Sequence, residues 1–256
     1  MVGYKELAQY DVFSIEDVKK LTNNNLKTAY SLLERLMKKD LVRKIRKNVY
    51  SCVNPATGQV IASRNQIACA VNDTAYLSHH SAFEFYGLAN QIYYTVYISS
   101  ESKFRDFEFE NITYKYIHSK SKMGVVKPKN TSGVRVTDLE RTVVDNIKDF
   151  KKIGGFEELL NCLENVNYLD ESKLKSYLEM YDIQVLYQKT GYLLSHYKEN
   201  MQLSDDFFEY CKSNIGMSTR YLLKKNNDES NYNNEWKLVI PNNIFYVTNQ
   251  SGDELV

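Results

Sequence analysis

The residues whose chemistry is easiest to assign are basic, and they gather in the first part of the chain. Seven lysines and arginines but only one acid, Asp40, lie between Arg35 and Lys47. Residues 1–53 carry eleven basic and six acidic side chains, although the whole chain has a net charge of only +1. Basic clusters favour nucleic acid because they neutralise backbone phosphates. We therefore expect a nucleic-acid-binding module joined to a mildly acidic body with a second function.

Other reactive side chains form no recognisable catalytic or metal-binding pattern. The four cysteines are scattered without a C-x-x-C pair, and the adjacent His79 and His80 would point to different sides of one helix. Gly154 and Gly155 lack the other positions of a phosphate-binding loop. We expect no metal, no cofactor and no enzymatic activity, and we expect buried, reduced thiols.

The acidic pair Asp138 and Glu140 is the feature that could suggest catalysis. Both residues lie at the start of a predicted helix, where Asp138 can cap the helix and the helix dipole favours the charge of Glu140. We favour this structural role. An enzyme that acts on nucleic acid through this pair stays the least favoured alternative.

Three short helices are predicted to position the basic residues. The first covers about residues 2–10, and the second starts after Phe13, with Ser14 as its cap and Asp17 as the reciprocal partner of a capping box. The third covers about residues 25–39. Its apolar residues recur at helical spacing on one side: Leu26, Ala29, Leu32, Leu33, Leu36 and Met37.

A β-hairpin is predicted to follow these helices. Two β-prone runs, residues 41–45 and 49–53, flank the polar turn 46–48. Asn48 tolerates the left-handed backbone conformation that such a turn needs. Three helices followed by a basic hairpin predict a winged helix-turn-helix over residues 1–55.

This arrangement predicts a surface for duplex DNA. The third helix would enter a major groove with its amino-terminal end, and the hairpin tip would reach the backbone or the minor groove. Lys27, Tyr30 and Ser31 lead the candidates, and Glu34 weakens the hypothesis unless a basic neighbour pairs with it. The full set of predicted contacts is Asn25, Lys27, Thr28, Tyr30, Ser31, Arg35, Lys38, Arg46, Lys47 and Asn48. Solvated amphipathic helices often carry a basic face too, and some winged helices bind protein instead.

The rest of the chain is predicted to form a second, mixed α/β domain over residues 60–256, after a linker with Pro55 and Gly58. The predicted helices cover residues 63–71, 78–86, 138–148, 156–166, 171–180, 184–200 and 205–213. The predicted strands cover residues 93–99, 107–109, 112–117 and 134–136, with extended pieces at 221–223 and 236–240. We expect a small, mainly antiparallel sheet, a polar loop at residues 226–234, and an α+β fold class overall.

Hydropathy gives an expectation about location. No apolar run approaches the length that spans a bilayer, and the first residues lack the apolar core of a signal peptide. We expect a cytoplasmic protein without membrane contact.

Five short stretches, spread along the chain, form an ordered set of motifs: residues 44–50 (KIRKNVY), 75–88 (AYLSHHSAFEFYGL), 136–145 (VTDLERTVVD), 218–223 (STRYLL) and 234–238 (NEWKL). Together they resemble the AbiEi family, the antitoxins and transcriptional regulators of type IV (abortive-infection) toxin–antitoxin systems. The family often has glycine where this chain has Asn48, and asparagine can also hold a positive φ.

The resemblance implies a dual role in phage defence. The winged helix would repress the protein's own operon by binding inverted repeats in its promoter, as a dimer or as two monomers. The second domain would counter a nucleotidyltransferase-like toxin without forming a stable complex with it. The residues themselves leave open a ligand- or protein-responsive repressor with no toxin partner.

Overall fold

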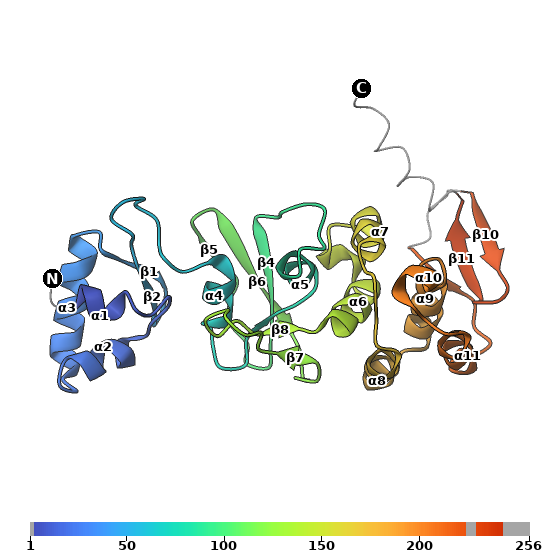
Figure 1. The fold of residues 1–256 in the computed structure, drawn as a ribbon, viewed down its shortest axis with the longest axis horizontal. Helices are drawn as coiled ribbons and strands as arrows, with labels where there is room; N and C mark the ends of the chain where they lie inside the picture. Colours follow the sequence, from blue (N-terminus) through green and yellow to red (C-terminus); the bar gives the residue numbers. More distant parts are fainter. Residues whose placement is uncertain (1–2, 224–228, 243–256) are drawn as a thin grey trace, which may run out of the picture. The chain divides into compact units, whose positions relative to one another are not determined.

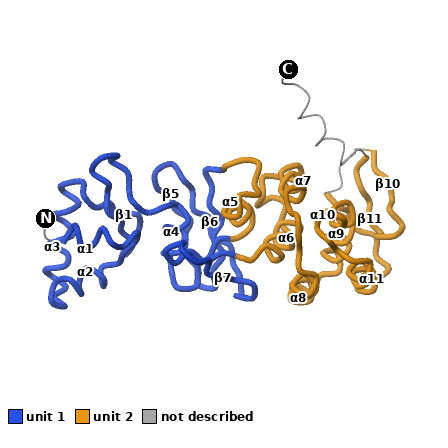
Figure 2. The backbone as a smooth tube through the Cα atoms, viewed as in Figure 1, with its two compact units in different colours: residues 1–77, 93–136 blue, residues 78–92, 137–256 orange. Residues whose placement is uncertain are grey.

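The computed structural model describes residues 3–223 and 229–242, which form a mixed α+β fold (Figure 1). The chain divides into two compact units (Figure 2). Unit 1 comprises Met1–Leu77 and Tyr93–Val136, and unit 2 comprises Ser78–Ile92 and Thr137–Val256. Both units are discontinuous in sequence, and the division predicted near residues 55–60 stays a prediction. Within the described residues, no helix is both long and apolar enough to cross a membrane.

Three helices and an antiparallel hairpin form the first part of unit 1. They are α1 (Tyr4–Leu7), α2 (Ile15–Leu21), α3 (Leu26–Lys38), β1 (Val42–Arg46) and β2 (Val49–Cys52). Ile61 packs against their core from beyond β2, and the buried members of this core all come from this part of the chain: Leu7, Phe13, Val18, Ala29, Leu33, Leu36, Val42, Tyr50 and Cys52. The capping box of α2 is confirmed, since Ser14 accepts from the backbone N–H of Asp17 and donates its own N–H to the Asp17 carboxylate.

Helix α3 buries a narrower face than its sequence predicts. Ala29, Leu33 and Leu36 are buried, as expected. Leu26 and Met37 were expected in the same stripe but are exposed, because at 100° per residue both project at one edge of the stripe formed by Ala29, Leu33 and Leu36. The hairpin turn is also shorter than expected. Arg46 belongs to β1 rather than to the turn.

A six-stranded sheet forms the second part of unit 1, with only Thr137 belonging to unit 2. Its strands are β3 (Tyr76–Leu77), β4 (Thr95–Ser100), β5 (Phe107–Phe109), β6 (Ile112–His118), β7 (Val125–Val126) and β8 (Val136–Thr137), in the order β5-β6-β4-β3-β8-β7. Helix α4 (Arg64–Cys69) packs against β3 and β4.

The prediction of a mainly antiparallel sheet is wrong, because the sheet is mixed. Strands β5–β6 and β3–β4 pair antiparallel, whereas β4–β6 and β3–β8 pair parallel. After β4 the chain runs to the edge strand β5, which points in the opposite direction to β4. It then turns back as β6, antiparallel to β5, so β6 runs parallel to β4. The predicted hairpin at Glu110 and Asn111 is confirmed, and both residues have the positive φ of a tight two-residue turn.

Unit 2 packs helices around α6 (Leu139–Lys148). The other helical elements are α5 (His80–Phe85), η1 (Phe150–Lys152), α7 (Phe156–Glu164), α8 (Glu171–Tyr181), α9 (Gln184–Ser195), α10 (Lys198–Met201) and α11 (Asp205–Ser213). A three-stranded sheet in the order β10-β11-β9 completes the unit, with β9 (Arg220–Tyr221), β10 (Ser230–Asn233) and β11 (Leu238–Pro241). Its hydrophobic core runs from Phe83 to Ile240 and includes Trp236.

Three expectations for unit 2 are corrected. The helix predicted over residues 184–200 is two helices, because the backbone leaves helical geometry at Tyr197 (φ −113°, ψ 16°). The cap of α5 is His79 rather than Ser78. Part of the loop predicted at 226–234 is strand β10, a polar edge strand without an apolar signal, while residues 226–228 lie outside the described residues.

Candidate nucleic-acid interface

The predicted contact residues of α3 and its cap all lie on the exposed side of the helix. They are Asn25, Lys27, Thr28, Tyr30, Ser31, Arg35 and Lys38. They are exposed because the opposite side of α3 is fixed in the core by Ala29, Leu33 and Leu36. Tyr30 is about half exposed (53%), as several other tyrosines of the chain are, so its ring is accessible to a partner. The structure thus brings these seven residues onto one helix surface.

Asn25 has a second task within this surface. Its side-chain Oδ1 accepts the backbone N–H of Thr28 at 3.0 Å, which makes Asn25 the amino-terminal cap of α3. Its carbonyl-type oxygen is committed to the helix, but the remaining free N–H groups of the first turn still favour a negatively charged partner. The amino-terminal end of α3, which carries the partial positive charge of the helix dipole, is therefore next to the exposed side chain of Lys27.

Glu34, the acidic residue of this surface, has a basic partner. Its Oε1 lies 2.9 Å from Nζ of Lys38, one helical turn further on, and both side chains are exposed. An exposed pair of this kind contributes only about 0.3–0.5 kcal/mol to stability, so it is easily exchanged for other contacts. Its main consequence is electrostatic, because the carboxylate charge is compensated within α3 itself.

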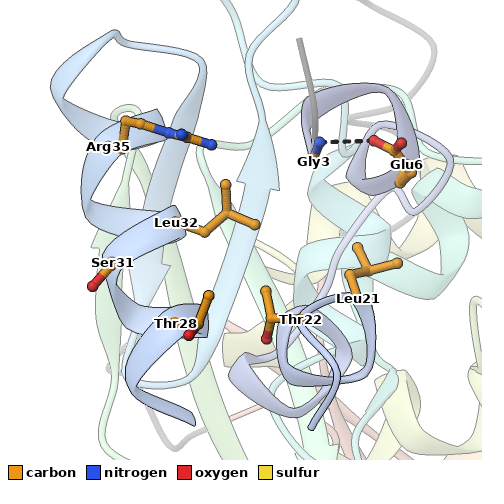
Figure 3. Close-up of a pocket in the computed structure, with 8 residues that line it drawn as sticks. All are labelled: Gly3, Glu6, Leu21, Thr22, Thr28, Ser31, Leu32 and Arg35. Carbon is orange, nitrogen blue, oxygen red and sulfur yellow. Dashed lines mark hydrogen bonds between the residues drawn. The ribbon is translucent and has the colours of Figure 1, made fainter. Parts of the chain in front are cut away.

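A pocket of about 390 Å³ lies beside α3, as Figure 3 shows. Its lining residues come from α1 and its entry, the end of α2, and α3: Gly3, Glu6, Leu21, Thr22, Thr28, Ser31, Leu32 and Arg35. Leu32 and Arg35 extend from α3 toward α1, whereas Ser31 is directed away from that space. Three of the predicted DNA contacts therefore border a concave surface rather than a flat one.

The hairpin presents two lysines to solvent. Lys47 is exposed in the turn, as predicted, and Lys44 is exposed on β1. Lys44 was not among the predicted contacts, and strand alternation gave no signal for it, because a residue two positions after the buried Val42 would be expected on the same face. Asn48 has the positive φ (61°) that was predicted, but its side chain accepts the backbone N–H of Ile15 at 3.0 Å. Asn48 therefore serves the fold of this module.

Arg46 does not lie where the sequence placed it. Its guanidinium carbon is 5.3 Å from the ring centroid of Phe104 and 4.8 Å from that of Phe107. Its Nη1 atom is buried and has no hydrogen-bond partner among residues 3–223 and 229–242. Burial lowers the pKa of this guanidinium from its ordinary value, although arginine stays charged at neutral pH. Arg46 is turned inward and is no part of the exposed tip.

Arg43 is also committed within unit 1. Its guanidinium donates to both carboxylate oxygens of Asp40, at 3.3 and 3.2 Å, and to Glu110 Oε1 at 2.8 Å. The basic cluster counted in the sequence is therefore smaller on the surface. On the hairpin, the basic side chains left fully exposed are Lys44 and Lys47.

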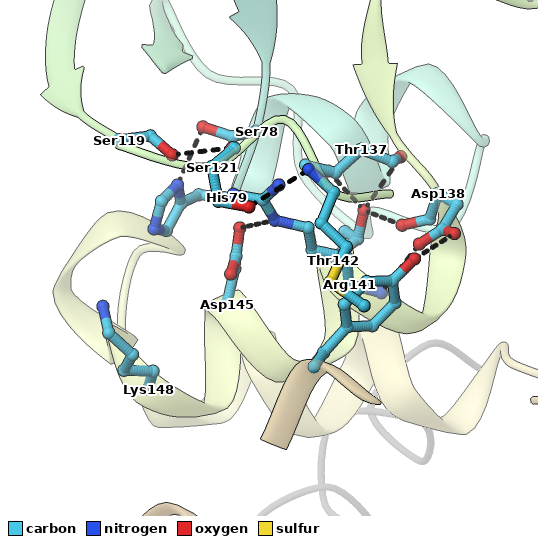
Figure 4. Close-up of polar contacts among 12 residues, drawn as sticks. Ser78, His79, Ser119, Ser121, Thr137, Asp138, Arg141, Thr142, Asp145 and Lys148 are labelled. Carbon is cyan, nitrogen blue, oxygen red and sulfur yellow. Dashed lines mark hydrogen bonds and ion pairs between the residues drawn. The ribbon is translucent and has the colours of Figure 1, made fainter. Parts of the chain in front are cut away.

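Both members of the acidic pair, Asp138 and Glu140, have partners in unit 2, and Figure 4 shows the contacts of Asp138. Asp138 caps α6 through the backbone N–H of Arg141, at 3.0 Å, and accepts the hydroxyl of Tyr177 at 2.6 Å. Glu140 accepts the backbone N–H of Asp170 at 3.1 Å and lies 3.3 Å from Nζ of Lys173. The predicted cap is thus confirmed. Burial raises the pKa of Asp138 above its usual range, against the hydrogen bonds that it accepts.

Around this pair, unit 2 buries further charged groups. Arg141 Nε lies 3.6 Å from Asp145 (Figure 4). Asp145 also accepts the hydroxyl of Tyr181. His80 is fully buried, with Nε2 3.2 Å from Glu158. Parts of two stretches that carry the family resemblance, residues 78–88 and 137–145, thus each bury charged side chains in unit 2. Such networks specify a unique packing when their members are satisfied.

Asp149 is the most strongly perturbed carboxyl of this region. Lys152 Nζ and Lys148 Nζ lie 2.7 and 3.0 Å from its Oδ2, and His79 Nε2 lies 3.6 Å away. His79 and the two lysines hold the pKa of this carboxyl well below its usual range. Asp149 is therefore ionised at every physiological pH and acts as a fixed charge.

Neither metal-binding nor reactive-thiol chemistry is evident in the described residues. Within the described residues, no group of three or more His, Cys, Asp or Glu could hold a metal ion. The four cysteines are free and buried, as expected. Burial raises the pKa of Cys52 to about 11 and that of Cys211 to about 12, so these thiols are poor nucleophiles.

Comparisons with known proteins give one informative likeness. No protein-family model matches this chain, and no curated protein matches it either. Among solved structures, the RV2827C protein from Mycobacterium tuberculosis is similar, with a TM-score of 0.69 and 15% sequence identity. The alignment covers 97% of this chain and 94% of the mycobacterial one. The present chain therefore shares the fold of that protein over almost its entire length.

Proposed function

We propose that the first part of unit 1 is a winged helix-turn-helix that binds duplex DNA. The observation that carries the proposal is the exposed side of α3, where Lys27, Tyr30 and Ser31 stand opposite a fully buried stripe. The positive end of α3 and the two exposed hairpin lysines, Lys44 and Lys47, add favourable charge for phosphates. In this proposal α3 enters the major groove and the β1–β2 hairpin contacts the adjacent backbone.

The biological role we propose follows from the resemblance to the AbiEi family. The protein acts in the cytoplasm as an antitoxin of a type IV toxin–antitoxin system and represses its own operon at inverted repeats in the promoter. Residues beyond the DNA-binding module oppose a nucleotidyltransferase-like toxin without a stable complex. The hydrogen bonds of Asp138 and Glu140 favour a structural role for this pair over a catalytic one.

The DNA-binding proposal is tested by titrating the full-length protein into a labelled duplex from the DNA upstream of its gene. Binding should weaken with salt, since each phosphate contact releases counterions. Lys27→Ala and Lys47→Ala should each reduce the slope of log K against log salt by about 0.9. Lys129→Ala, which changes an exposed lysine elsewhere in unit 1, is the matched control and should leave both affinity and slope unchanged.

A result that contradicts the proposal is equally specific. If wild-type protein at stoichiometric concentrations gives no salt-dependent shift of the duplex, the DNA-binding proposal is wrong and α3 needs another partner. The antitoxic role is tested separately. Cells that express the neighbouring toxin should grow when they also carry full-length protein with both Lys27→Ala and Lys47→Ala, because the proposal assigns toxin neutralisation to other residues.

A second candidate function is a repressor that responds to a small ligand, and the pocket beside α3 favours it. A volume of about 390 Å³ lies in the range of small-molecule sites, and Thr28, Ser31 and Arg35 belong both to the pocket and to the proposed DNA surface. A ligand held there would compete with DNA. Growth rescue from a neighbouring toxin would favour the antitoxin, whereas a gene neighbourhood without a nucleotidyltransferase would favour this alternative.

A further inference from the structure

The β1–β2 hairpin meets the β5–β6 edge of the sheet in unit 1 through one arginine and an aromatic cluster. The guanidinium of Arg46 lies over Phe107 and Phe104, at 4.8 and 5.3 Å from the ring centroids. Phe107 in turn stacks on Tyr114, with centroids 4.6 Å apart and planes inclined by 5°. Phe104 meets Tyr116 edge to face at 5.0 Å. The hairpin is therefore seated on rings that belong to another part of the chain.

The chemistry of this contact is a cation–π interaction in a partly dry environment. A guanidinium is attracted by the negative face of an aromatic ring, and the attraction grows as water is removed. The buried Nη1 atom of Arg46 makes no hydrogen bond within the described residues, so the rings are its main partners there. An arginine that binds a phosphate would instead turn its donors outward.

A second contact holds the same hairpin. Arg43 Nη1 lies 2.8 Å from Oε1 of Glu110, in the tight turn that joins β5 to β6. The two side chains are each about one-third exposed, so this ion pair contributes less than a buried one would. Two contacts at different points along β1 restrict the rotation of the hairpin more than either would alone.

We infer that Arg46 is a positioning residue for DNA binding: it orients the β1–β2 hairpin on Phe104 and Phe107, and thereby presents Lys44 and Lys47 to the DNA backbone. The inference rests on the proposed function. The inference also makes the β5–β6 edge a part of the DNA-binding module. In sequence, this edge lies far beyond residue 55, the predicted end of the module.

The salt dependence of DNA binding separates a positioning residue from a phosphate contact. Arg46→Met removes the charge but keeps a long side chain over the rings. Its affinity for the upstream duplex should fall roughly three- to thirty-fold at each salt concentration, the range that corresponds to a cation–π contact. The slope of log K against log salt should equal that of the wild type. Lys47→Ala, by contrast, should lower the slope by about 0.9.

Phe107→Leu is the matched variant on the other side of the contact. Leucine removes the aromatic face without changing any charge, so we expect an affinity loss like that of Arg46→Met and an unchanged slope. The double variant should bind about as well as either single variant, because both substitutions remove the same contact. Circular dichroism and thermal unfolding verify the fold, and Phe104→Leu replaces Phe107→Leu if the latter does not fold.

Three outcomes would overturn parts of this scheme, and they differ. A slope reduced in Arg46→Met, with wild-type behaviour of Phe107→Leu, makes Arg46 a direct phosphate ligand. Wild-type affinity in both variants removes any role for the contact in DNA binding. A wild-type protein without salt-dependent DNA binding overturns the proposed function itself, and the positioning role with it.

Discussion

The side-chain Oδ1 of Asn48 accepts a hydrogen bond from the backbone N–H of Ile15 at 3.0 Å. Ile15 is the first residue of α2, so its N–H has no partner inside the helix. Asn48 holds a φ of 61°, which places its side chain where it can reach this group from the hairpin turn. The turn and the helix are thus joined by one residue, and glycine could supply the backbone conformation there but not the hydrogen bond.

Substitution of Asn48 should separate these two contributions. Asn48→Gly keeps the left-handed conformation and loses the hydrogen bond, at a cost of about 1 kcal/mol. Asn48→Ala loses the hydrogen bond and also pays about 1–2 kcal/mol for an alanine in the left-handed region. Urea unfolding followed by circular dichroism measures both. Equal stability of the two variants would show that backbone conformation contributes nothing at this position.

Gly191 on α9 is predicted to tolerate no side chain. A Cβ atom there would lie 2.1 Å from Cζ3 and 2.3 Å from Cη2 of the buried Trp236. Gly191→Ala should therefore destabilise the protein by about 1–3 kcal/mol, as overpacking does in a filled core. Because Trp236 is the single tryptophan, its fluorescence spectrum should change as well.

Gly58→Ala is the control for Gly191→Ala. Its Cβ would meet nothing within 4 Å, although a φ of +68° makes alanine strained there. We expect a loss of about 1–2 kcal/mol from the backbone alone and an unchanged tryptophan spectrum. An unaltered spectrum in Gly191→Ala would contradict the predicted displacement of the indole.

The stability that Asp149 contributes should depend on pH in a defined direction. Its pKa is lower in the folded protein than in the unfolded chain, where aspartate titrates near about 3.9. The contribution is therefore present above that value and is lost as the pH falls below it toward the folded pKa. Asp149→Asn should cost about 1–2 kcal/mol at neutral pH, and the difference from the wild type should shrink below about pH 4.

Chemical denaturation at a series of pH values tests this prediction for Asp149. Asp73→Asn, at an exposed aspartate, is the control and should leave the stability at neutral pH close to that of the wild type. A difference for Asp149→Asn that stays constant down to pH 3 would mean that the carboxylate charge is not what the two lysines and His79 stabilise.

Glu140 distinguishes a structural acid from a catalytic one. Glu140→Gln keeps an acceptor for the backbone N–H of Asp170 and weakens the contact with Lys173, which is about half exposed. We expect a loss of about 1 kcal/mol or less and full growth rescue in a toxin assay. Lys173→Gln removes the charge of the other partner and should cause the same small loss of stability, again with full growth rescue. Loss of rescue in Glu140→Gln, with fold and DNA binding intact, would instead favour an enzyme.

Local signals in the sequence predicted the parts of the fold that depend on neighbours in the chain. The capping box of Ser14 and Asp17, the cap at Asp138 and the turn at Glu110 each use residues a few positions apart. Helical spacing likewise located α3 and the major helices of unit 2. Parallel strand pairing escaped prediction because it joins segments distant in sequence, such as β3 and β8.

The candidate site was predictable only as far as exposure on one helix. Periodicity placed Lys27 and Tyr30 on the outer side of α3, and the structure has them there. The sequence could not distinguish exposed basic residues from those already paired. Arg43 and Arg46 were counted with the free charges, but their partners arise about sixty residues later, in Glu110, Phe104 and Phe107. No local pattern reports such a contact.

The discontinuity of unit 2 has a consequence for the order in which a nascent chain folds. The core of α1–α3 and the hairpin can assemble early, because its buried members precede residue 53. Helix α5 is also synthesised early, yet Phe83 and His80 have their partners in α6 and α7. A ribosome must therefore add five of the six strands of the sheet, β4 to β8, before α5 can be buried. Until then, α5 is the segment that a chaperone would find exposed, while the proposed DNA-binding helices already have their core.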